Sequence, residues 1–88
     1  MKLAGEFVVR QVADTIVAVP VGQTALRLNG MIMLNDVSKV IWSCLENQTD
    51  PDRITAAVTD AFAVTEEEAR ADILEFLDKL RKLQLLDE

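Results

Sequence analysis

The sequence contains no histidine and no tyrosine, and only one cysteine and one tryptophan among its 88 residues. Histidine is the commonest general base and metal ligand, so its absence removes many catalytic and metal sites. Gly5, Gly22 and Gly30 lie too far apart to form a phosphate-binding loop. A lone Cys44 excludes an intramolecular disulfide, and its apolar neighbours favour a small buried side chain over a reactive thiol. We therefore interpret the chain as a binding protein without a cofactor or metal, not as an enzyme.

Basic residues are also scarce, since nine Lys and Arg stand against 15 Asp and Glu and give a net charge of −6. Nucleic acid binding depends on clustered positive charge, so we expect no nucleic acid partner. No apolar run approaches the roughly 18 residues of a membrane span, and no signal peptide is evident, which favours a cytoplasmic protein without a membrane partner. The acidic run Glu66-Glu67-Glu68 suits the first turn of a helix better than a cation site.

The residues that are present predict a small antiparallel sheet between residues 7 and 34. The β-branched runs "EFVVRQV" and "TIVAVPV" are typical of two strands that turn at Ala13-Asp14. Asn29-Gly30 separates "ALRL" from "MIML" and favours a second hairpin, with an ordinary loop as the alternative. A chain of this length has room for one core, so residues 1–88 are expected to form a single domain.

After Asn35 the apolar period changes from two to 3.6, which predicts helices over 36–47, 51–62 and 66–84. Asn35 or Asp36 would cap the first helix, and Asp50 followed by Pro51 would begin the second. Thr65 and Glu68 have the spacing of a capping box for the third. Trp42, on the first helix, is expected to be at least partly buried. The predicted fold class is α+β, with a small N-terminal antiparallel sheet followed by three α-helices.

The last predicted helix carries two stripes, which follow from a rotation of about 100° per residue. The first is apolar and would face the core; it consists of Ala69, Ile73, Phe76, Leu80 and Leu83. The second places two leucines between two arginines; it consists of Arg70, Leu74, Leu77 and Arg81. This second stripe could form the wall of a groove for an apolar peptide with acidic flanks. Alternatively, Leu77 widens the core and Leu74 is a scattered surface leucine.

Residue order and spacing across nearly the whole chain resemble a known family. The matching positions are Gly30, Ile32, Leu34, Asn35 and Asp36, then Ile41, Trp42 and Leu45, and then the block "ITAAVTDAFAVTEEEARADILEFLDKLRKLQLL". On these residues the chain is similar to the PqqD-like proteins, the RiPP recognition elements of ribosomal peptide modification systems. The extra apolar run "ALRLN" is a departure from the members of the PQQ pathway.

The resemblance implies a winged-helix-like fold in which the leader of a precursor peptide adds as a strand to the sheet edge and lies against the last helix. It also implies a partner enzyme, often a radical SAM protein, that modifies the delivered peptide. On this basis we expect peptide contacts at Met31, Ile32, Met33, Leu34, Arg70, Leu74, Leu77 and Arg81. Ile32 and Leu34 would face the helices, and Met31 and Met33 would face away or toward the peptide, although methionines also fill cores.

Two other functions remain open at this stage. The same order of elements could serve a winged-helix DNA-binding regulator, although "DPDRITAAVTDAF" has one Arg against three Asp and suits a major groove poorly. An exposed strand edge could also pair with a second copy of the chain, giving a homodimer.

Overall fold

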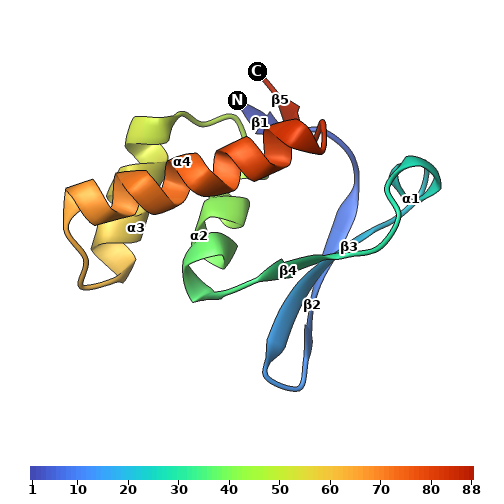
Figure 1. The fold of residues 1–88 in the computed structure, drawn as a ribbon, viewed down its shortest axis with the longest axis horizontal. Coiled ribbons are helices and arrows are strands. Elements are labelled where there is room, and N and C mark those ends of the chain that lie inside the picture. Colours follow the sequence, from blue (N-terminus) through green and yellow to red (C-terminus); the bar gives the residue numbers. More distant parts are fainter. The chain divides into compact units, whose positions relative to one another are not determined.

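The computed structural model describes residues 1–88 and contains five strands and four helices (Figure 1). The chain divides into two compact units, one formed by residues 5–36 and the other by residues 1–4 and 37–88. The elements in chain order are β1 (Lys2–Leu3), β2 (Phe7–Val12), β3 (Thr15–Pro20), α1 (Thr24–Arg27), β4 (Ile32–Leu34), α2 (Asp36–Leu45), α3 (Pro51–Ala61), α4 (Glu66–Lys82) and β5 (Leu86–Asp87). The predicted α+β class is confirmed.

The unit of residues 5–36 is a three-stranded antiparallel sheet in the order β2-β3-β4. The predicted first hairpin is confirmed, because Val12 pairs with Thr15 across a two-residue turn. Ala13 occupies the left-handed region in that turn, with φ of 55°. In β4 the side chains of Ile32 and Leu34 are buried and that of Met33 is exposed, which confirms the predicted alternation.

The predicted second hairpin is wrong. Residues 24–27 form the single-turn helix α1 in place of a strand, so Asn29-Gly30 does not join two strands. Four apolar and polar residues are too few to distinguish the two periods, and Ala, Leu and Arg are all good helix formers. Leu26 is 87% exposed, which agrees with a surface turn and not with a strand that packs on a core. Gly30, with φ of 98°, instead lies in the connection to β4.

Thr24 fixes α1 to the start of the sheet. Its side chain is buried, and its Oγ1 accepts a hydrogen bond of 2.8 Å from the backbone N–H of Glu6. Gly5 allows this close approach, because a Cβ at that position would lie 2.9 Å from Thr24 Oγ1. The hydroxyl of Thr24 therefore accepts from the N–H of the residue that precedes β2.

We expect Thr24→Val to lower the free energy of unfolding by about 0.5–1.5 kcal/mol, because it removes the partly buried hydrogen bond from the Glu6 N–H. Thr24→Ser keeps the hydroxyl and is the matched control. Urea denaturation followed by circular dichroism measures the difference. Equal stability of the two variants would show that packing, and not the hydrogen bond, holds α1.

The second unit contains helices α2, α3 and α4 and a short ladder of β1 with β5. Each predicted cap of the last two helices is confirmed: the side chain of Asp50 accepts from the N–H of Arg53, and that of Thr65 accepts from the N–H of Glu68. The pairing of Lys2 with Asp87 was not predicted, because two-residue strands leave no periodic pattern. None of the helices has an apolar stretch of the length needed to cross a membrane.

The core of this unit is aliphatic around one tryptophan, and Trp42 is buried as predicted, at 2% exposure. Its other buried apolar side chains are Ile41, Leu45, Ile54, Val58, Ala69, Ile73, Leu77, Leu80 and Leu85. On α4 the buried face is turned from the predicted one. Leu77 is fully buried, whereas Leu83 is 37% exposed, so Leu77 belongs to the core as the alternative interpretation held.

Candidate functional site: the β4 edge and the exposed face of α4

Strand β4 is one of the two edges of the three-stranded sheet, so one side of its backbone has no neighbouring strand. Which groups point to that side follows from the register. The N–H of Val21 donates to the carbonyl of Glu6 at 3.0 Å, in continuation of the β2-β3 register. Hydrogen-bonded pairs alternate along an antiparallel ladder, so Val17 also turns its backbone groups toward β2. Ile16 and Ala18, between these positions, turn theirs toward β4.

The partners of these residues determine the open edge. Ile16 faces Leu34 and Ala18 faces Ile32, so Ile32 and Leu34 direct their backbone groups toward β3. Met33, between them, directs its N–H and C=O to the open side. Its side chain is 65% exposed and that of Met31 is 58% exposed. The edge thus combines outward-pointing hydrogen-bonding groups with two adaptable apolar side chains, the features used when an extended peptide joins a sheet.

The exposed face of α4 contains three of the four residues of the predicted second stripe. Leu74 is 56% exposed, whereas Leu77 is fully buried. Arg70 and Arg81 lie one turn before and two turns after Leu74, and their side chains are 43% and 40% exposed. The structure therefore separates the two predicted leucines into one surface residue and one core residue.

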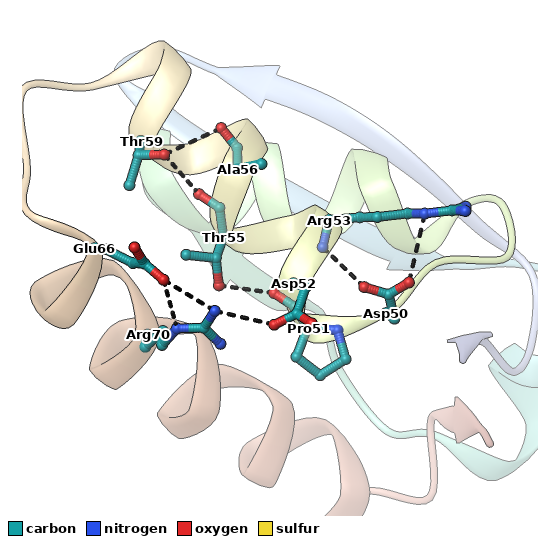
Figure 2. Close-up of polar contacts among 9 residues, drawn as sticks. All are labelled: Asp50, Pro51, Asp52, Arg53, Thr55, Ala56, Thr59, Glu66 and Arg70. Atoms are coloured by element: carbon teal, nitrogen blue, oxygen red, sulfur yellow. Dashed lines mark hydrogen bonds and ion pairs between the residues drawn. The ribbon is translucent and has the colours of Figure 1, made fainter.

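Both arginines are paired within their own unit. Figure 2 shows Arg70 between α3 and α4, where its Nη2 lies 3.0 Å from Asp52 Oδ1 and 3.1 Å from Glu66 Oε1. These hydrogen bonds raise the pKa of Arg70, with that to Asp52 contributing most. The Glu66 partner could have been found from its spacing of four residues on one helix. The Asp52 partner could not, because it lies on a different helix.

Arg81 forms a two-pronged pair with Glu88. Its Nε donates to Oε2 at 3.0 Å and its Nη2 donates to Oε1 at 2.9 Å. The hydrogen bonds raise the pKa of Arg81 and lower the pKa of Glu88. No sequence spacing indicated this contact, because it depends on the chain turning back after α4.

The remaining polar side chains form neither a metal site nor an activated thiol. No group of three or more Cys, Asp or Glu side chains is placed to hold a metal ion. Cys44 is partly buried, and burial raises the pKa of its thiol, which disfavours the reactive thiolate. The arrangement suits non-covalent binding of an extended chain.

Comparisons with known proteins agree with this fold. The family model described as Coenzyme PQQ synthesis protein D (PqqD) matches residues 16–86. Among solved structures, TbiB1 in complex with the TbiA(beta) leader peptide matches with a TM-score of 0.73 and 25% identity, over 99% of this chain and 95% of that chain. No curated protein matches. Because the family model covers most of the chain, from β3 to β5, the protein belongs to the PqqD family.

Proposed function

We propose that this protein binds the leader of a ribosomally made precursor peptide and presents it, in the cytoplasm, to a modifying enzyme such as a radical SAM protein. The observation that carries the proposal is the open edge of β4, where the backbone of Met33 points outward and the side chains of Met31 and Met33 are exposed. The likeness to TbiB1, a protein solved with a leader peptide, supports the same function.

The leader is proposed to add as a strand to β4. Met31 and Met33 contact its side chains, and the outward backbone groups of Met33 pair with its main chain. Ile32 and Leu34 hold the strand in place through their buried side chains. An exposed edge is an aggregation hazard that proteins usually block, so an edge with two exposed methionines is best explained by a partner that uses it.

The face of α4 is proposed as the second contact region. Leu74 supplies an apolar anchor and Leu77 supports it from the core. Of the two predicted arginines, Arg81 has one carboxylate partner and is better placed to meet an acidic leader than Arg70, which has two. Local positive charge matters here, since the net charge of −6 would otherwise repel such a peptide.

The test uses synthetic peptides that correspond to the N-terminal segments of short reading frames beside the gene. One of them should bind with a dissociation constant between about 10 nM and 10 μM, the range plausible for a short added strand with a few anchors. In ¹⁵N-resolved NMR spectra the amide signals of residues 31–34 should shift on titration. Binding that leaves these signals unchanged would contradict the assignment of the edge.

Sedimentation at several protein concentrations accompanies the titration. Pairing of the edge with a second copy would appear as a concentration-dependent dimer that the peptide dissociates. A protein that stays monomeric and binds the peptide would support the leader-binding function alone.

A further inference from the structure

Arg81 already binds a carboxylate of its own chain, that of Glu88, in the two-bond geometry that it would use for a carboxylate of a peptide. Two parallel N–H···O bonds, 3.0 and 2.9 Å long, join its guanidinium to the two oxygens of Glu88. This bidentate geometry is the strongest and most specific that an arginine makes with a carboxylate. A carboxylate of a bound peptide could take the same place only if Glu88 leaves it.

The chain fold brings Glu88 to this place. After α4, Gln84 adopts a left-handed conformation with φ of 59°, and its N–H donates to the carbonyl of Arg81 at 2.9 Å. Leu85 is fully buried, and its N–H donates to the carbonyl of Leu80 at 2.9 Å. The pairing of β5 with β1 then fixes the backbone next to Glu88. The contact is thus a product of the tight turn, and the carboxylate is held close to the guanidinium.

A peptide carboxylate can replace the carboxylate partner of Arg81 more easily than the partners of Arg70. The Arg81 and Glu88 side chains are 40% and 47% exposed, and an exposed pair of this kind contributes little to stability. Arg70 instead lies between two carboxylates, Asp52 and Glu66, which belong to two helices. A peptide carboxylate at Arg70 would be repelled by both. At Arg81 it needs to replace only Glu88, which can turn into water, because the nearby Asp78 forms its ion pair with Lys82.

Resting on the proposed function, we infer that Glu88 competes with a leader carboxylate for the guanidinium of Arg81 and so sets the preference of the α4 face for acidic peptides. The pair with Glu88 keeps Arg81 neutralised until a suitably placed Asp or Glu of the peptide displaces it. An amide or apolar residue at that point of the peptide cannot displace it. Arg70, by this reasoning, mainly holds α3 and α4 together.

The experiment uses a peptide selected from a displayed library of random linear peptides on the immobilised full chain. It is synthesised with a fluorescent label, both as selected and with each Asp or Glu changed in turn to Asn or Gln. Dissociation constants are measured by fluorescence anisotropy for the wild type, Glu88→Gln, Asp87→Asn and Arg81→Gln. Asp87→Asn is the matched control, because it removes the same charge from the neighbouring residue without freeing Arg81.

We expect Glu88→Gln to bind the acidic peptide about two- to fivefold more tightly than Asp87→Asn does, a range that corresponds to the strength of an exposed ion pair. One amide-substituted peptide should bind both variants equally, and Arg81→Gln should bind that peptide and the acidic one alike. Equal affinities of Glu88→Gln and Asp87→Asn for every peptide would overturn this inference and leave the proposed function intact. Failure to select any peptide whose binding shifts residues 31–34 would overturn both.

Discussion

Leu77→Ala is expected to lower the free energy of unfolding by about 2–5 kcal/mol, the usual cost of a cavity at a buried leucine. Leu77 has no exposed surface, so the methyl groups that are lost leave their neighbours without contacts. Leu74→Ala should cost less than about 1 kcal/mol, because Leu74 is 56% exposed and already partly in water. Urea denaturation of the two variants, which differ only in position on one helix, measures the contrast.

Binding should show the opposite order. Leu74→Ala is expected to weaken peptide binding by about 1–2 kcal/mol, a factor of roughly 5–30, if Leu74 is an anchor for the leader. Leu77→Ala should retain most of its affinity under conditions where it stays folded, because its side chain lies in the core. A Leu74→Ala protein with unchanged affinity would remove α4 from the proposed binding site. Strong destabilisation of that variant would instead place Leu74 in the core.

Met33→Pro is expected to reduce peptide affinity about tenfold or more. Proline removes the N–H that points to the open edge of β4, and its ring occupies the space of an incoming strand. The hydrogen bonds of β4 to β3 come from Ile32 and Leu34, so the ladder inside the sheet keeps its donors. Titration of the variant with the same labelled peptide measures the loss, and circular dichroism reports whether the sheet persists.

Val9→Pro is the matched control on the other edge of the sheet. Glu6, just before β2, accepts a hydrogen bond from the β3 side, so the backbone groups of every second residue after it, from Val8 onward, also point toward β3. The backbone groups of Val9 point to the open side. Proline at position 9 therefore removes an N–H from the outer edge of β2 and leaves the hydrogen bonds between β2 and β3 in place. We expect similar stability for the two proline variants but near-normal binding by Val9→Pro. Equal loss of binding in both would mean that the substitution acts through the sheet as a whole.

The longer elements could be predicted because each contains its own signal. Strands β2 and β3 are marked by β-branched runs, and α3 and α4 begin at caps that the structure confirms, Asp50 and Thr65. The short elements could not be predicted. α1 has four residues, and each of β1 and β5 has two, so none is long enough for its pattern to repeat. Their conformation depends on partners far along the chain, such as the bond from Glu6 to Thr24.

The residues of the candidate site also fall into a group that local patterns predicted and a group that they did not. Alternation along "MIML" predicted which side chains of β4 are buried and which are exposed, because successive residues of a strand face opposite sides. Helical spacing also placed Arg70, Leu74 and Arg81 on one face of α4. Periodicity could not decide the role of Leu77, since it lies on the border of the second stripe next to the first, and only the packing of the unit buries it.

The sequence by itself determined that this is an acidic α+β chain without histidine, with an apolar strand ahead of its last three helices and two distinct stripes on the last helix. These properties follow from composition and local periodicity, which depend only on neighbours in the chain. The tertiary structure alone decided which edge groups of β4 point outward, which leucine of α4 is exposed, and which carboxylates hold the arginines. Each of these depends on residues far apart in the sequence, such as Asp52 and Arg70, so no local pattern contains it.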